Sequence, residues 1–372
     1  MVLHFMRVSL ALGAKALAVF SIALSGAVIS SAEEQAALPY GLAAEAQLAS
    51  RYADEIELLW SQRVKRGEFK GVGGVKLAYA SAVVPDERAA VVIVTGRTEN
   101  LLKYQEVVAD FVSQKYSVYV YDHRGQGFSE RLLPAEPEKG HVGDFDDYVV
   151  DLQTFVQDVV KRDPHKRLFV LAHSMGGGVA TRHLQRFPGV FDAAAMSSPM
   201  HQPNSTILIS PDSSCWYFRL TGLIFGEAWA GGKARPYSHH PYDETTNEYT
   251  HSQVRWAHVL QVENEFPKVR LGGPTRRWVA EACGASSALL SGASNVATPV
   301  LVLQAGMDTA VTPEGQDEFC AALAKTTGRP CDGGGPQRIE GARHELLIEA
   351  DKYRVPAMTK ILDFYNRQLT GS

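Results

Sequence analysis

Three side chains that together could cleave an acyl bond occur in the chain, each shortly after an apolar run. Ser174 follows LFVLAH, Asp308 follows PVLVLQAGM, and His344 follows RIEGAR. A serine hydroxyl becomes a good nucleophile only when a base removes its proton, and a third group must orient that base. Histidine and aspartate are the residue types that fill these two roles. The sequence therefore predicts a catalytic triad of Ser174, Asp308 and His344.

Each member of this triad also has a plainer interpretation. A serine before a helix can cap it, Asp308 could be an ordinary turn residue, and His344, one of 12 histidines, could cap the helix that follows it. Their placement favours chemistry, because each follows its own predicted strand and the chain order is serine, acid, histidine. The stretch AHSMG, from Ala172 to Gly176, also has the spacing of a nucleophile elbow, with alanine where the first glycine is usual.

Acyl cleavage passes through an oxyanion, which needs preorganised backbone N–H donors. We expect one donor to be the amide of Met175, directly after the nucleophile. The second should come from the loop TGRTEN, which follows the apolar run AAVVIV, through the main-chain amide of Arg97. The side chain of Arg97 is expected to be a solvated loop cation without a catalytic role.

These residues can meet only if several strands end at one edge of a sheet. A hairpin is expected within EFKGVGGVKLAYASAVV, followed by short apolar runs typical of buried strands, at residues 89–96, 117–122, 168–172, 193–198, 298–306 and near QRIEG. Segments with helical spacing are expected at residues 42–66, 101–115, 145–161, 176–187, 313–325 and 355–369. Alternating strands and helices predict an α/β fold with a mostly parallel central sheet flanked by helices on both faces.

The alternation stops over residues 199–295, which we interpret as an inserted cap, or lid, over the carboxyl ends of the strands, where ligands bind in such sheets. The core is then formed by residues 33–198 and 296–372. Four of the five tryptophans lie in the cap, and Cys215 to Gly232 reads CWYFRLTGLIFGEAWAGG. This apolar surface could line an acyl-chain pocket, where each buried methylene contributes about 0.8 kcal/mol. The alternative is that it forms the cap's own small core.

The first 32 residues have the order of a secretory signal. Arg7 and Lys15 precede an apolar centre, and the small residues Ser30, Ser31 and Ala32 follow it. We expect export with cleavage after Ala32, which places the protein in the periplasm; the alternative is an uncleaved N-terminal membrane anchor. The net charge of −4 and the lack of a basic block give no support for a nucleic-acid partner.

Four cysteines suit an oxidising compartment. Sequence alone allows three pairings, of which Cys320–Cys331 and Cys215–Cys283 are the natural one by position. The spacings do not suggest a zinc site, and we predict neither a metal nor an organic cofactor.

Three further motifs carry a family resemblance. YDHRGQGFSERLL, GHVGDFDDYVVDL and LAHSMGGG resemble the lysophospholipase and monoacylglycerol-lipase branch of the α/β-hydrolase family, over residues 91–200 and 299–349. The family's catalytic residues map onto Ser174, Asp308 and His344. Ala172 and the loop TGRTEN depart from the monoacylglycerol-lipase pattern, which has glycine at the elbow and His-Gly-x-Gly-Glu-His in the loop. The remaining motif residues Asp122, Arg124 and Gly127 are expected to brace that loop.

The resemblance implies a serine ester hydrolase that acts on single-chain lipids, lysophospholipids first and monoacylglycerols second. Its cap is a candidate for peripheral contact with a membrane. The alternatives are a short-chain carboxylesterase on the same scaffold and, in a different class, a non-catalytic lipid-binding protein.

Overall fold

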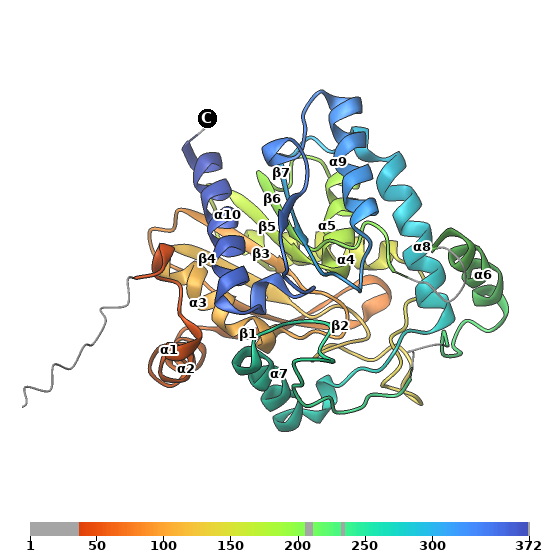
Figure 1. Ribbon diagram of the computed structural model, residues 1–372, viewed down its shortest axis with the longest axis horizontal. Helices are drawn as coiled ribbons and strands as arrows, with labels where there is room; N and C mark the ends of the chain where they lie inside the picture. Colours follow the sequence, from red (N-terminus) through yellow and green to blue (C-terminus); the bar gives the residue numbers. More distant parts are fainter. Residues whose placement is uncertain (1–36, 205–210, 232–234, 371–372) are drawn as a thin grey trace, which may run out of the picture. The chain divides into compact units, whose positions relative to one another are not determined.

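The computed structural model of the protein describes residues 37–204, 211–231 and 235–370 (Figure 1). The expected signal segment, residues 1–32, lies outside these ranges. Within them, none of the helices combines the length and the apolar character that crossing a membrane requires.

Eight strands form one sheet in the order β1-β2-β4-β3-β5-β6-β7-β8. They are β1 (Lys65–Lys70), β2 (Lys76–Ala82), β3 (Ala89–Val94), β4 (Tyr116–Tyr121), β5 (Leu168–His173), β6 (Ala193–Ser197), β7 (Val300–Ala305) and β8 (Gln337–Ile339). Strand β2 runs antiparallel to both β1 and β4, whereas the strands from β4 to β8 are mutually parallel. The predicted mostly parallel sheet is thus confirmed, with an antiparallel hairpin at one edge.

Helices cover both faces of the sheet (Figure 1). Val92 and Val94 of β3 point to the face covered by α4 (Asp146–Asp158), α5 (Met175–Arg186), α8 (Arg276–Ser291) and α9 (Pro313–Thr327). Val91 and Ile93 point to the opposite face, covered by α3 (Gln105–Ser113) and α10 (Asp351–Thr370). All residues of β3 are buried, as expected for a strand covered on both sides.

Two helix boundaries differ from the sequence prediction. The expected helix over residues 42–66 is shorter: it runs from Glu45 to Gln62 as α1 (Glu45–Arg51), a π-helical stretch at Tyr52–Ile56 and α2 (Glu57–Gln62), and β1 begins soon after it at Lys65. The last helix begins at Asp351 rather than at residue 355 and continues through Pro356. The missing N–H of a proline costs one backbone hydrogen bond, and the residues on both sides of Pro356 pack into the core.

Residues 199–295 contain α6 (Pro211–Ile224), α7 (Gln253–Glu265) and α8 and no βα unit among the residues described. The disulfide Cys215–Cys283 links α6 to α8, and Cys320–Cys331 links α9 to the turn before β8. Both have a Cα–Cα distance of 5.5 Å. Of the three pairings that the sequence allows, the structure contains the one favoured by position.

Candidate active site

Ser174 occupies the turn between β5 and α5. Its backbone has φ 52° and ψ −122°, a left-handed conformation that costs a non-glycine residue about 1–3 kcal/mol. Neighbouring backbone holds this conformation: the amide of Ser174 donates to the Ser197 carbonyl at 3.1 Å, and its carbonyl accepts from the Met200 amide at 2.8 Å. The sharp turn keeps the half-buried hydroxyl at the carboxyl edge of the sheet.

The glycines after the nucleophile allow α5 to approach the sheet closely. A Cβ on Gly176 would lie 2.2 Å from the Val94 carbonyl oxygen, and one on Gly177 would lie 2.4 Å from the Cβ of Pro199. Neither neighbour is the end of a flexible side chain, so a larger residue would displace the backbone. Ala172, in contrast, is fully buried, and its methyl group fits within the elbow.

The three predicted triad residues meet in one hydrogen-bonded line. Nε2 of His344 lies 2.9 Å from Oγ of Ser174, and Nδ1 lies 2.7 Å from Oδ2 of Asp308. Because a carboxylate only accepts hydrogen bonds, Nδ1 carries the proton, which leaves Nε2 free to accept the serine proton. The line therefore has the geometry that general-base activation of a hydroxyl requires.

Asp308 is held in place from two sides. Its Oδ1 accepts hydrogen bonds from the amides of Ala310 at 2.8 Å and Val311 at 3.1 Å. Burial alone would raise the pKa of Asp308, but the charge and hydrogen bond of His344, together with the two amides, lower it below its usual value. The carboxylate is thus ionised and able to orient the imidazole.

The expected oxyanion donors lie on the two loops beside the serine. Met175 is the first residue of α5, where an amide has no acceptor within its own helix. Arg97 lies in the loop between β3 and the short helix η4 (Leu101–Tyr104). The prediction that its side chain is solvated is wrong: the guanidinium donates to the Gly272 carbonyl at 2.9 Å and lies 5.5 Å from the ring centroid of Trp278. Segments before and within α8 cover it, and burial lowers its pKa.

Asp122 braces the loops behind the site. Its two carboxylate oxygens accept from the amides of Leu101 at 2.6 Å and Phe128 at 2.7 Å. Gly127 has φ +55°, and a Cβ there would lie 2.3 Å from Oδ2 of Asp122. Arg124 instead binds Asp151 through two nitrogens, at 2.6 and 2.7 Å.

Four buried charged groups near the triad were given no role in the sequence analysis. Glu99, Lys103, His173 and Glu345, which we call the charge cluster, lie behind the serine and histidine. A signal was available, since His173 precedes Ser174 and Glu345 follows His344 in the chain.

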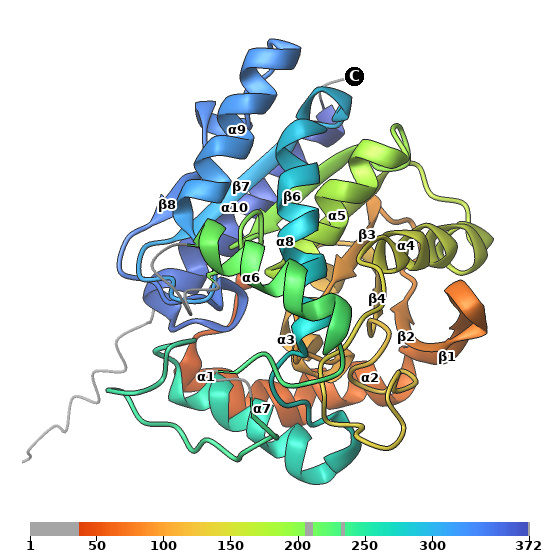
Figure 2. The same cartoon turned by 90° about the vertical axis from the view of Figure 1, so that its right-hand side faces the viewer.

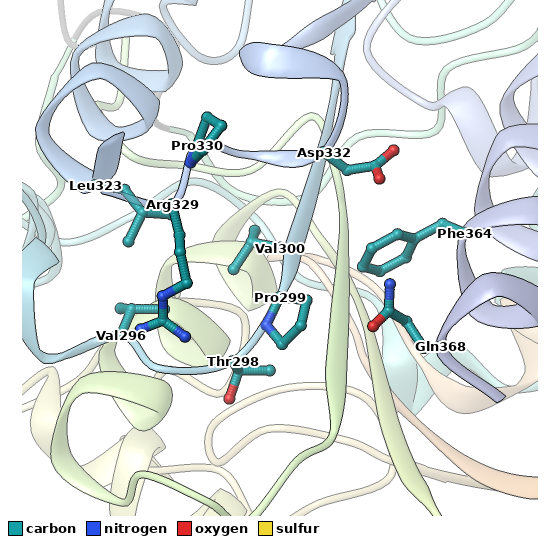
Figure 3. A pocket seen from close by; sticks show the side chains of 10 residues that line it. All are labelled: Val296, Thr298, Pro299, Val300, Leu323, Arg329, Pro330, Asp332, Phe364 and Gln368. Carbon is teal, nitrogen blue, oxygen red and sulfur yellow. The ribbon is translucent and has the colours of Figure 1, made fainter. Parts of the chain in front are cut away.

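A separate cavity of about 150 Å³ lies at the opposite edge of the sheet, by the amino end of β7 (Figure 3). Its two charged side chains are engaged elsewhere. Arg329 donates to the Ala297 carbonyl at 2.6 Å, and Asp332 pairs with Arg367 at 2.8 Å. This cavity contains no aligned nucleophile and base.

A hydroxyl, an imidazole and a carboxylate aligned at the carboxyl edge of a sheet covered by helices define a serine hydrolase of the α/β-hydrolase class. Comparison with known proteins agrees. Residues 85–351 match the family described as "Serine aminopeptidase, S33". Because this match spans most of the chain, the protein belongs to that family.

Two curated relatives and one solved structure illustrate the similarity. The chain is 39% identical to "Lysophospholipase L2" of Escherichia coli (strain K12), over 84% of this chain and 90% of the relative. It is 33% identical to "Monoacylglycerol lipase" of Mycolicibacterium smegmatis, over 38% of this chain and 50% of the relative. A highly thermostable carboxyl esterase from Bacillus coagulans shares the fold, with a TM-score of 0.63 at 15% identity over 83% of this chain and 99% of the other.

Proposed function

We propose that the protein hydrolyses the acyl ester of single-chain lipids, with lysophospholipids as its principal substrates. The observation that carries this proposal is the aligned Ser174–His344–Asp308 triad in a chain similar to Lysophospholipase L2 over 90% of that relative's length. The ester hydrolase activity deduced from the motifs thus agrees with both the fold and the relatives.

The proposed reaction has two halves. His344 takes the proton of Ser174 as the oxygen attacks the ester carbonyl carbon, and the oxyanion is bound by the amides of Met175 and Arg97. The oxyanion then collapses and the bond to the glycerol oxygen breaks, His344 gives its proton to that oxygen of the departing glycerophosphodiester, and an acyl ester remains on Ser174. Water, deprotonated by His344, attacks this ester and releases the fatty acid. Asp308 stabilises the imidazolium in both halves.

Monoacylglycerols are the second candidate substrate class. The monoglyceride lipase of Homo sapiens is 29% identical, over 37% of this chain and 41% of its own length. The loop TGRTEN lacks both histidines of the monoacylglycerol-lipase pattern but keeps Gly96 and Glu99. We therefore expect monoacylglycerols to be cleaved more slowly than lysophospholipids.

A substrate panel tests the assignment. The mature protein and Ser174→Ala are compared on a lysophospholipid, a monoacylglycerol, a soluble short-chain ester and an aminoacyl amide, the last because of the family description. We expect the lysophospholipid to have the highest kcat/KM, and Ser174→Ala to lose at least about 10³-fold in kcat on every substrate. A fluorophosphonate probe should label the wild type at Ser174 only. Preference for the amide, or full activity of the alanine variant, would contradict the proposal.

Residues 199–295 are proposed to form a cap that contacts the lipid surface through α6, which packs on α8 (Figure 2). Trp216, Leu220, Leu223 and Ile224 are 54–74% exposed and share one side of α6 at helical spacing. Phe225, directly after the helix, is 59% exposed. An apolar stripe of this kind is unusual on a surface that meets only water.

Vesicle binding tests the cap contact. The double variant Leu223→Asn/Ile224→Asn should bind phosphatidylglycerol vesicles at least about tenfold more weakly than the wild type, because it lacks two apolar side chains that binding would transfer from water into the lipid. Leu58→Asn, at a leucine 48% exposed on α2, is the matched control and should bind normally. Hydrolysis of the soluble ester should be the same in all three proteins. Equal vesicle binding by all of them would refute a contact through α6.

Export is proposed on the charge and hydropathy order of residues 1–32 alone. In this proposal the protein functions in the periplasm, either released after Ala32 or attached by an uncleaved N-terminus. N-terminal sequencing of the protein recovered from a periplasmic fraction should begin at Glu33; an intact Met1 on a membrane-bound protein would favour the anchor.

A further inference from the structure

The charge cluster joins the three loops that supply the proposed nucleophile, base and oxyanion donor. Glu99 lies two residues after Arg97, His173 directly precedes Ser174, and Glu345 directly follows His344. Nζ of Lys103 bridges the two carboxylates, at 2.5 Å from Glu99 and 2.7 Å from Glu345. All four cluster side chains are at most 10% exposed.

Both nitrogens of the His173 ring lie near oxygen atoms. Nδ1 lies 3.1 Å from the Ser197 carbonyl oxygen, which can only accept a hydrogen bond. Nε2 lies within ion-pair distance of two carboxylates, 3.2 Å from a Glu345 oxygen and 3.9 Å from a Glu99 oxygen, without an aligned hydrogen bond to either. A neutral imidazole has one unprotonated nitrogen, whose lone pair would here face the lone pairs of oxygen. A doubly protonated ring instead places a positive charge beside these carboxylate oxygens.

Charge balance leads to the same conclusion. With His173 protonated, the cluster holds two negative and two positive charges; with a neutral ring it would hold an uncompensated negative charge away from water, which is strongly unfavourable. Burial alone would lower the pKa of His173, but Glu345 and Glu99 raise it above its usual value. The same neighbours act on the other members: the carboxylates raise the pKa of Lys103, and the cations hold that of Glu345 well below its usual range.

A metal ion is the alternative occupant of such a cluster. One ligand atom from each of Glu99, His173 and Glu345 lies within 4.8 Å of the others, which a metal could bridge. The ammonium of Lys103, however, already contacts both carboxylates and supplies their counter-charge. The geometry thus assigns to lysine the place that a metal ion would take.

We propose that Lys103 and an imidazolium at His173 neutralise the two buried carboxylates, and that the resulting cluster positions the nucleophile and base loops for reaction. Its four members are positioning residues: none touches the reacting atoms, but the His173 ring lies 4.9 Å, centroid to centroid, from the ring of His344. This inference rests on the proposed function, since it concerns the same three loops.

Charge-changing variants test the positioning role. Lys103→Met leaves an excess negative charge and Glu345→Gln an excess positive one, whereas the double variant is balanced. We expect each single variant to lose about 10- to 100-fold in kcat with KM changed less than about threefold, because misplacement of reacting groups affects the chemical step. The double variant should exceed the weaker single variant in kcat by at least about fivefold, since coupled neighbours are not additive. Lys161→Met and Glu57→Gln, at exposed positions, are the matched controls and should match the wild type.

The protonation state of His173 is measured separately. In ¹⁵N NMR spectra of the histidine side chains, the signal that disappears in His173→Gln should still report two protonated nitrogens above the ordinary histidine pKa of 6.5. The groups facing this ring are Glu99, Lys103, Glu345 and His344, and Glu345→Gln should shift its titration to lower pH. A neutral ring at pH 7, or a double variant no better than the weaker single one, would overturn the proposal.

These results remain informative if lysophospholipids prove not to be substrates. The NMR measurement needs no substrate, and the rate of fluorophosphonate labelling at Ser174 reports how well the nucleophile and base are aligned. Slower labelling in the single variants, with recovery in the double variant, would support the cluster even if the proposed substrate class were wrong. Unchanged labelling in all variants would overturn the cluster even if lysophospholipids were cleaved.

Discussion

At the scale of single residues, the site depends on a backbone conformation at Ser174 that residues other than glycine rarely adopt. Ser174 adopts a positive φ because neighbouring backbone groups hold its amide and carbonyl, and the glycine after Met175 lets α5 start against the end of β3. The backbone of the turn therefore positions the hydroxyl, in addition to the contacts of the side chain itself. Among the described residues, the side chain that hydrogen-bonds to the hydroxyl is that of His344.

Alanine at Gly176 tests this dependence on close backbone contact. Its Cβ would lie 2.2 and 2.4 Å from the carbonyl oxygens of Val94 and Thr95, so the turn must shift. We expect the free energy of unfolding to fall by about 2–4 kcal/mol and kcat to fall at least about 100-fold. Urea unfolding and ester hydrolysis measure the two effects.

The matched control is Gly284→Ala, at a glycine in α8 whose added Cβ would have no neighbour within 4 Å. Alanine in a helix should stabilise this position by about 0.5–1 kcal/mol without changing kcat. Equal effects of the two substitutions would mean that close approach does not explain the glycine at residue 176.

Much of the site could be predicted at this scale, and the missing part has a physical reason. Ser174, Asp308 and His344 each follow an apolar run, and parallel strands bring such positions to one edge of a sheet. The charge cluster depends instead on contacts between side chains from different loops. Local sequence does not show that Lys103 lies between two carboxylates, so the burial of these groups was not predicted.

At the scale of elements, the helices of residues 199–295 are attached to the core unequally. Arg255 of α7 is buried and binds Glu106 of α3 through two nitrogens, at 2.9 and 3.0 Å, and Asp351 of α10 at 3.0 Å. Helix α8 contributes buried residues to one face of the sheet. Helix α6 exposes much of its apolar surface and is covalently joined to α8.

Removal of the disulfide on α6 should reveal this difference. The disulfide lost in Cys215→Ala/Cys283→Ala joins residues 68 positions apart in the sequence. The one lost in Cys320→Ala/Cys331→Ala joins residues only 11 positions apart. Chain entropy predicts losses of about 4 and about 3 kcal/mol, respectively, in the free energy of unfolding. Limited proteolysis should cut first within α6 in the former variant only. A larger loss in the variant lacking Cys320–Cys331, with α6 still protected, would contradict this account.

Element types were easier to predict than element ends. The apolar runs of β3, β5 and β7 predict buried strands because β-branched and aliphatic residues suit a sheet covered on both faces. The start of α10 was missed because tertiary contacts stabilise it: a carboxylate oxygen of Asp351 accepts from the amide of Glu45 at 2.7 Å. That partner lies at the other end of the described chain, where local sequence patterns cannot indicate it.

At the scale of the whole molecule, buried histidines determine how stability depends on pH. Burial lowers the pKa of His123 to about 4 and those of His183 and His201 to about 3. Below the ordinary value of 6.5, the unfolded chain binds protons at these positions and the folded chain does not, so acidification favours unfolding. Asp122 opposes this effect, because burial raises its pKa to about 7 and the folded state then holds its proton longer.

Two other histidines act on the alkaline side. Burial alone would lower the pKa of His165, but its contact with Glu87 at 2.7 Å raises it, and the carboxylates of the cluster do the same for His173. A raised pKa contributes stability that is fully present below 6.5 and is lost as the pH rises through the raised value. The histidines with lowered pKa therefore destabilise the protein below pH 6.5, and those with raised pKa destabilise it above pH 6.5.

We therefore expect the free energy of unfolding to be greatest near pH 6.5. Three histidines opposed by one aspartate give a net difference of about two protons, and His141 and His258 add to it because burial lowers their pKa too. Stability should therefore fall by at least about 2–3 kcal/mol per pH unit below about pH 6. Urea unfolding at pH 5.5, 6.5 and 8 measures the curve. His183→Gln should reduce the acid slope by about one proton's worth, about 1.4 kcal/mol per pH unit. His165→Gln should flatten only the decline above pH 6.5, because a raised pKa affects stability only above the ordinary histidine value. The contrary result would be a free energy of unfolding that increases steadily from pH 5.5 to 8 in both the wild type and His165→Gln. In that case neither the histidines with lowered pKa nor those with raised pKa control the pH dependence of stability.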